Sequence, residues 1–205
     1  MSRKLLYHKI YGLILSAGLS GRMKMFKPLA NYKGKTFIHN IILKLNPVCE
    51  KIFIVTGFNS EKLKYEITKT FSNEKELLSK INFVYNENYK QGMFTSLQKG
   101  ISSASDCDWI LYHFVDQPGL PGNFYKEFVK QINSEYNWIQ PTNKKRHGHP
   151  ILLGKDLFEL IIKSSPESNL REISKSPIVN KKYWECGYKE IFQDIDTKID
   201  LEELK

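Results

Sequence analysis

Short apolar runs alternate along this chain with longer stretches of helical spacing, and this alternation limits the possible folds more than any other feature. Runs of the kind that form buried strands cover residues 11–17, 51–56, 81–85 and 109–115. Apolar residues spaced three and four apart predict helices at residues 37–45, 60–71, 92–104 and 122–132. The alternation predicts an α/β fold in which helices cover both faces of a parallel sheet.

The last third of the chain has a less regular pattern. It predicts a strand near residues 151–153 and a helix over 156–162, followed by loops. Neither an internal repeat nor a Pro/Gly-rich linker divides the 205 residues, a length that suits one hydrophobic core. We therefore expect a single domain over residues 1–205.

Composition excludes several classes of protein. The formal net charge is +9, but the lysines are scattered and no nucleic-acid-binding motif accompanies them. A polyphosphate ligand would benefit from the same positive field. The apolar runs are too short to span a membrane, and the N-terminal one is too short and interrupted for a secretory signal. Three widely separated cysteines predict reduced thiols in a cytoplasmic protein.

A basic loop follows the first predicted strand, in the segment LILSAGLSGRMKMFKPL. Gly18 and Gly21 would let backbone N–H groups turn toward an anion, and Arg22, Lys24 and Lys27 follow without an acidic residue. Ligands of open parallel sheets bind beyond the carboxyl ends of the strands. The loop is therefore predicted to hold phosphate groups. The alternative is that Arg22 and Lys27 are ordinary surface cations.

Carboxylates follow other predicted strands. Asp116 comes directly after the run at 109–115, where it suits a Mg²⁺ ion that also contacts substrate phosphates or, alternatively, starts a turn. Asp194 and Asp196 have period-2 spacing on a predicted strand and would point the same way, so that one of them could supply a second metal ligand.

Other phosphate-binding and nucleophile motifs do not fit. Gly34-Lys35-Thr36 is similar to the end of a P-loop, but Leu29 stands where the first glycine is needed. This segment is predicted to be a polar turn before the helix at 37–45. The G-x-S-x-G elbow fails at Arg22, and no G-x-G-x-x-G follows the first strand.

Several motifs in one order resemble those of the molybdenum cofactor cytidylyltransferase family, which has a MobA-like NTP transferase domain. The loop segment resembles the family signature L-x-A-[AG]-G-x-S-x-R-M-G-x-x-K-x-L. The further matching segments are VTGF, NENYKQGMFTSLQKG, DQP, GHPILL, NLREI and DIDTKIDL, which begin at residues 55, 86, 116, 148, 169 and 194. Together they extend over nearly the whole chain.

The resemblance implies a fold, a reaction and two parts of the chain. The fold would be a three-layer α/β/α Rossmann-like sheet of the nucleotide-diphospho-sugar transferase type. The reaction would be Mg²⁺-dependent transfer of CMP from CTP to the terminal phosphate of molybdopterin, with release of pyrophosphate. Residues 10–118 would bind the nucleotide, while residues 119–205 would bind the acceptor and complete the sheet. A molybdenum hydroxylase apo-enzyme would be a possible protein partner.

The resemblance also implies roles for individual residues. Lys27, Arg22 and Asp116 would be catalytic, with Asp116 and Asp196 as the metal ligands. His149 and Arg171 would contact the acceptor. The nucleotide would be bound by Leu15, Ser16, Ala17, Gly18, Ser20, Arg22, Lys27 and Ser96, although the Ser96 hydroxyl could instead bond to its own helical turn.

The choice of nucleotide and acceptor depends on a few positions. Ala17 resembles the cytidine type of the signature, and its methyl group leaves less room for a purine than glycine would. Lys24 and Val115 stand where the family has glycine. The alternatives are use of GTP, another phosphorylated acceptor such as a sugar, alditol or choline phosphate, or a non-catalytic molybdenum cofactor carrier.

Overall fold

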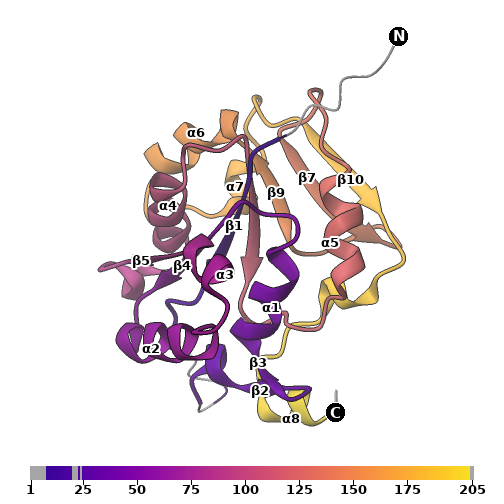
Figure 1. Cartoon of the computed structure of the whole chain (residues 1–205). Coiled ribbons are helices and arrows are strands. Elements are labelled where there is room, and N and C mark those ends of the chain that lie inside the picture. Colours follow the sequence, from indigo (N-terminus) through magenta and orange to yellow (C-terminus); the bar gives the residue numbers. More distant parts are fainter. Residues whose placement is uncertain (1–7, 20–22, 24, 204–205) are drawn as a thin grey trace.

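A mixed β-sheet with helices on both faces forms the centre of the molecule (Figure 1). The computed structural model describes residues 8–19, 23 and 25–203. Within these residues the main sheet has eight strands. Seven follow one another in the spatial order β10 (Lys181–Glu185), β7 (Trp138–Asn143), β9 (Ile151–Gly154), β6 (Trp109–Phe114), β1 (Ile10–Leu15), β4 (Lys51–Thr56) and β5 (Ile81–Tyr85). The eighth, β8 (Arg146–His147), pairs with β7.

The sheet is parallel in its N-terminal part and mixed beyond it. β1 pairs in parallel with both β4 and β6, and β4 pairs in parallel with β5. The sheet departs from the predicted parallel arrangement at β9, which runs antiparallel to its neighbours β6 and β7. This reversal occurs because the chain returns from β7 to β9 without a crossover helix, and parallel neighbours require one.

The strands alternate their side chains between two apolar layers. Ile14 of β1 packs with α1 (Phe37–Leu45), α2 (Ser60–Thr70) and α5 (Gly122–Val129) on one face. Leu13 packs with α4 (Met93–Ser103) and α6 (Phe158–Lys163) on the other. Because successive strand residues point to opposite faces, this arrangement gives the predicted three-layer α/β/α fold.

Shorter elements connect or extend these layers. The polar turn at Gly34 joins a small hairpin, β2 (Asn31–Tyr32) and β3 (Lys35–Thr36), and Gly34 has a φ of 81° there. The remaining elements are α3 (Lys75–Lys80), α7 (Leu170–Ile173), α8 (Lys198–Glu202) and the 3-10 turns η2 (Lys27–Leu29), η3 (Tyr89–Gln91), η4 (Lys155–Leu157) and η5 (Lys189–Phe192).

Several predicted details of the last third are wrong. The segment with Asp194 and Asp196 is an irregular loop before α8 and not a strand. The alternation of polar and apolar residues in this segment arises because Ile195 is buried between the two aspartates. Ile195 also donates its backbone N–H to the Asp116 carbonyl oxygen at 2.9 Å. Helix α5 ends at Val129 instead of Ile132. The helix expected at 156–162 begins as the 3-10 turn η4.

Candidate active site

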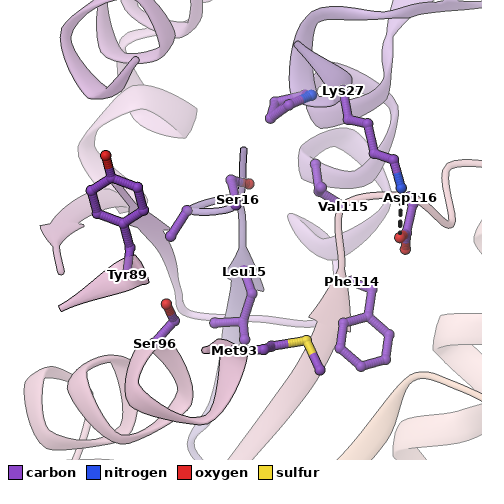
Figure 2. Close-up of a pocket in the computed structure, with 12 residues that line it drawn as sticks. Leu15, Ser16, Lys27, Tyr89, Met93, Ser96, Phe114, Val115 and Asp116 are labelled. Atoms are coloured by element: carbon purple, nitrogen blue, oxygen red, sulfur yellow. Dashed lines mark hydrogen bonds and ion pairs between the residues drawn. The ribbon is translucent and has the colours of Figure 1, made fainter. Parts of the chain in front are cut away.

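A cavity of about 260 Å³ lies at the carboxyl ends of β1 and β6, which is the edge predicted to bind the ligand (Figure 2). Seven of the predicted site residues line it: Leu15, Ser16, Ala17, Gly18, Lys27, Ser96 and Asp116. Pro28, Tyr89, Met93, Phe114 and Val115 complete the lining. Ser20 and Arg22, and also Lys24, lie outside the described residues.

The loop after β1 continues along the neighbouring strand β4. The Ser16 N–H donates to the Val55 carbonyl oxygen at 2.9 Å, and the Ala17 carbonyl oxygen accepts from the Phe58 N–H at 3.1 Å. Gly57 allows this close approach, because an added Cβ would lie 2.8 Å from the Ala17 oxygen and 2.6 Å from the Tyr89 ring. The backbone of residues 16–18 is thereby fixed at the cavity wall.

Lys27 lies between two carboxylates at one end of the cavity. Its Nζ is 3.3 Å from Asp116 and forms a second ion pair with Asp196. The Lys27 side chain is 11% exposed, whereas the two carboxylate side chains are 25% and 26% exposed. Salt screening is weak at such burial, so these charges interact more strongly than an exposed ion pair would.

Asp116 is held in a site that is unfavourable for its charged form. Burial raises the pKa of the Asp116 carboxyl above its ordinary value, and the Lys27 ammonium opposes this shift. Its Oδ1 is buried and lacks a hydrogen-bond partner among the described residues. A buried carboxylate oxygen in this condition can accept a donor or a cation supplied by a ligand.

The two C-terminal carboxylates do not have the same partners. Asp194 accepts a hydrogen bond from Gln117 Nε2 at 2.7 Å, whereas Asp196 faces Lys27. The Asp196 N–H donates to Asp200 Oδ2 at 2.9 Å, and Asp200 also forms the capping box of α8 with Thr197. Asp200 therefore positions Asp196, a role that sequence reasoning missed although the T-x-x-D pattern of a capping box was present.

The opposite end of the cavity is uncharged. Figure 2 shows Tyr89 and Ser96 on the other side of Leu15 and Ser16 from Lys27 and Asp116. Asn86 donates through Nδ2 to the Ser96 Oγ at 2.9 Å, so the hydroxyl is bonded across the loop to Asn86 instead of to its own turn. Sequence reasoning missed Tyr89, which the aromatic position within NENYKQG could have suggested.

A second cavity of about 390 Å³ adjoins the first, because Met93 and Phe114 line both. Met93, the first residue of α4, is 58% exposed at this boundary. His149 and Arg171, the predicted acceptor residues, both line the second cavity. The His149 ring lies 4.5 Å from the Phe114 ring, and burial lowers the pKa of His149 to about 4.

Other predictions concern groups away from the cavity. The three cysteines are free and buried, as expected for reduced thiols. Across the described part of the chain, the helices are too short or too polar to cross a membrane. The same described part contains no group of three or more His, Cys, Asp or Glu side chains that could hold a metal ion. The Asp116–Asp196 pair is the arrangement relevant to a cation that substrate phosphates would also bind.

Two curated relatives match almost the whole chain. The molybdenum cofactor cytidylyltransferase of Escherichia coli K12 is 27% identical over 190 residues, which cover 92% of each chain. A probable molybdenum cofactor guanylyltransferase of Bacillus cytotoxicus is 24% identical over 203 residues, which cover 95% of this chain and 96% of the relative. The two relatives differ in the nucleotide that their names specify.

The fold is shared with solved structures of low sequence identity. The crystal structure of Rv0371c from Mycobacterium tuberculosis H37Rv has a TM-score of 0.76 and 15% identity, covering 96% of this chain and 97% of that one. A crystal structure of Rv0371c in complex with manganese has a TM-score of 0.70 and 16% identity, with the same two coverages. The family of MobA-like NTP transferase domains matches residues 12–181. The chain therefore belongs to this family of nucleotidyltransferases.

Proposed function

We propose that this protein transfers CMP from CTP to the terminal phosphate of molybdopterin and releases pyrophosphate. The observation that carries the proposal is the pair of adjoining cavities, one of which has Lys27 and Asp116 at its charged end. Two reactants held in adjoining cavities can meet at the shared wall of Met93 and Phe114. The names of both relatives favour a molybdenum cofactor acceptor.

The charged end suits the triphosphate of the nucleotide. The Lys27 ammonium can interact with phosphate oxygens, and the backbone of residues 16–18 lines the same cavity. Arg22 and Ser20 lie outside the described residues, and phosphate binding by them stays a prediction from the sequence. The base would then occupy the uncharged end, where Tyr89 offers a ring for stacking and Ser96 offers a hydroxyl.

The donor set at the charged end fits a divalent cation. Mg²⁺ prefers oxygen ligands and is commonly bound by one or two carboxylates together with substrate phosphates. Asp116 and Asp196 supply two carboxylates, and the buried Asp116 Oδ1 has no hydrogen-bond partner among the described residues. When bound, the ion would neutralise charge on the phosphates of the substrate.

The proposed reaction needs no protein nucleophile. A phosphate oxygen of the acceptor attacks the α-phosphorus of CTP. The bond between that phosphorus and the oxygen that bridges the α- and β-phosphates breaks. The bridging oxygen leaves with pyrophosphate. Lys27 would stabilise the charge that develops on the α-phosphate and the leaving group. The contribution of the protein is therefore orientation and charge neutralisation.

The second cavity suits the acceptor. The Phe114 and His149 rings line it, and the exposed Arg171 guanidinium can donate two hydrogen bonds to an anionic group. Because the pKa of His149 is lowered to about 4, its ring is neutral near pH 7 and can lie against a flat, uncharged heterocycle. Reduced cysteines agree with the cytoplasmic location that the proposed function would require.

The test is pyrophosphate release from the purified protein with Mg²⁺, molybdopterin and CTP, GTP or ATP in parallel. We expect release with CTP, and a loss of about a thousandfold or more in Asp116→Asn. Asp156→Asn, a change at an exposed carboxylate outside the cavity, is the matched control and should keep activity. Faster release with GTP would contradict the role given to Ala17 and favour the guanylyltransferase reading of the second relative.

The acceptor is tested in the same assay. Release with a sugar, alditol or choline phosphate, but not with molybdopterin, would contradict the proposed acceptor while keeping the reaction class. Absence of release with every nucleotide and every acceptor would contradict the enzyme and favour a molybdenum cofactor carrier. Direct binding of molybdopterin to the inactive protein would then identify the carrier.

A further inference from the structure

Lys27 joins two carboxylates that are far apart in the sequence. Its Nζ is 3.3 Å from Asp116 and also pairs with Asp196, which is 169 residues away along the chain. The Lys27 ammonium thus lies between two carboxylates. Asp194 also raises the pKa of Asp116, and it accepts a hydrogen bond from Gln117. The ammonium therefore neutralises much of the repulsion between Asp116 and Asp196.

The two carboxylates are held by the backbone. The Asp116 carbonyl oxygen accepts from the Ile195 N–H at 2.9 Å, which ties the two carboxylate segments together. Asp196 is further held by its N–H bond to Asp200, at the cap of α8. Lys27 reaches the same point through a four-carbon side chain with several rotatable bonds. The ammonium is thus the member of the cluster that can move most easily.

We propose that Lys27 occupies, in the nucleotide-free protein, the position between Asp116 and Asp196 that a divalent cation takes once a nucleotide is bound. The inference depends on the metal site of the proposed function. An ammonium and a divalent cation repel each other at this distance and compete for the charge of the same two carboxylates, so that the ion and Lys27 exclude each other from the position between Asp116 and Asp196. The triphosphate attracts the Lys27 ammonium to itself and so frees the carboxylates for the ion.

The exchange makes metal binding and nucleotide binding depend on each other. Before the nucleotide arrives, an ion must displace Lys27 and leave an ammonium without its carboxylate partners. With the nucleotide present, the phosphates receive Lys27 and also supply further oxygen ligands. By linkage, a nucleotide that tightens metal binding is itself bound more tightly when the metal is present, by the same factor. Removal of the ammonium should therefore tighten metal binding in the nucleotide-free protein, although it removes a catalytic group.

The experiment measures binding of Mn²⁺ alone, by electron paramagnetic resonance of the free ion, to the wild-type protein, Lys27→Met and Lys27→Arg. We expect Lys27→Met to bind Mn²⁺ at least about tenfold more tightly than the wild type without nucleotide. Lys27→Arg keeps the charge and should stay weak. Asp116→Asn combined with Lys27→Met should lose the gain. Equal or weaker binding of Mn²⁺ by Lys27→Met than by the wild type would overturn the proposal.

A second measurement does not depend on how well Lys27→Met folds. A CTP analogue with a non-hydrolysable α–β bridge should tighten Mn²⁺ binding to the wild-type protein by about tenfold or more, and an unchanged affinity would overturn the proposal. Pyrophosphate release separates this proposal from the function. If the wild-type protein releases no pyrophosphate but Lys27→Met binds Mn²⁺ more tightly than the wild type, the exchange is supported and the proposed reaction is contradicted. If the wild-type protein is active but Lys27→Met does not change the affinity for Mn²⁺, only the exchange is contradicted.

Discussion

The two ends of the first cavity are built in different ways. The charged end combines Lys27, Asp116 and Asp196, which come from three distant parts of the chain. Lys27 and Asp116 follow the neighbouring strands β1 and β6, and the hydrogen bond from the Ile195 N–H to the Asp116 carbonyl oxygen brings Asp196 beside them. The uncharged end comes from one continuous segment after β5, in which Tyr89 lies in η3 and Ser96 in the first turn of α4. One end is assembled by the topology of the fold and the other by local structure.

This difference agrees with the division of work that the proposed reaction requires. The triphosphate is the same in every nucleoside triphosphate, so the groups that act on it need accurate positions but no discrimination. The base differs among nucleotides, so selectivity has to come from the uncharged end. We therefore expect changes at the charged end to lower kcat and changes at the uncharged end to alter KM and selectivity.

The largest effect expected from this comparison is on kcat, and it should distinguish Asp196 from the nearby Asp194. Asp196→Asn should lower kcat for pyrophosphate release by about a hundredfold or more, because the partner of Lys27 and a proposed metal ligand is lost. Asp194→Asn is the matched control, since Asp194 is two residues away and accepts from Gln117. We expect its kcat to stay within about threefold of the wild type. Equal losses in both variants would contradict the assignment of Asp196.

At the uncharged end, Tyr89→Ala should act on binding. Loss of a stacking ring should raise KM for CTP by about tenfold while kcat stays within about threefold. The preference for CTP over GTP should also decrease, because the ring borders the space for the base. Tyr85→Ala, at an exposed tyrosine outside the cavity, is the control and should leave KM unchanged. A fall in kcat at constant KM would contradict the proposed division between the two ends.

A smaller change concerns the boundary between the two ends. Ala17→Gly should increase kcat/KM for GTP relative to CTP by up to about tenfold, because the methyl group at the buried Ala17 limits the space beside the base. Steady-state kinetics with both nucleotides measure this ratio. Gly18→Ala, the opposite change at the next position of the loop, should not increase it. An unchanged ratio in Ala17→Gly would assign base selection to other residues.

Local patterns in the sequence predicted the N-terminal part of the fold well. Strand β4 and helix α1 have the predicted bounds, because their periodicity reflects burial on the sheet and on one helix face. Strands β7 and β10 were missed. β7 contains Gln140 and Pro141, and β10 is an edge strand with mostly polar or half-buried residues, so neither has the apolar run of a central strand.

For the site, seven of the residues named from the sequence line the first cavity, but the sequence did not show how they pair. Gly18 and Asp116 follow β1 and β6, which are neighbours in the sheet. Because ligands of such sheets bind at the carboxyl ends of the strands, the sequence predicted that both residues would lie at the same site. The Lys27–Asp196 ion pair depends on the loop before α8, which has no repeating pattern. Tyr89 lines the cavity from η3 and Met93 from the first residue of α4, and their roles depend on side-chain directions that spacing alone does not reveal.

The smallest expected effect lies at the acceptor cavity and concerns stability. Burial lowers the pKa of His149 to about 4, so the folded protein keeps this ring neutral near pH 6, whereas the unfolded chain binds a proton below about pH 6.5. By linkage, the free energy of unfolding should therefore decrease as the pH falls. Between pH 7.5 and pH 6 the contribution of this one histidine is about 0.8 kcal/mol.

Urea unfolding at the two pH values measures this contribution. His149→Gln should reduce the pH-dependent loss of stability by about 0.8 kcal/mol, because glutamine does not titrate. The buried His113, whose pKa burial lowers to about 3, keeps its own contribution in this variant. His147→Gln is the matched control at an exposed ring two residues away and should keep the full loss. If His149→Gln retains the wild-type loss, His149 binds its proton equally well in the folded and the unfolded protein, and the lowered pKa of its ring is wrong.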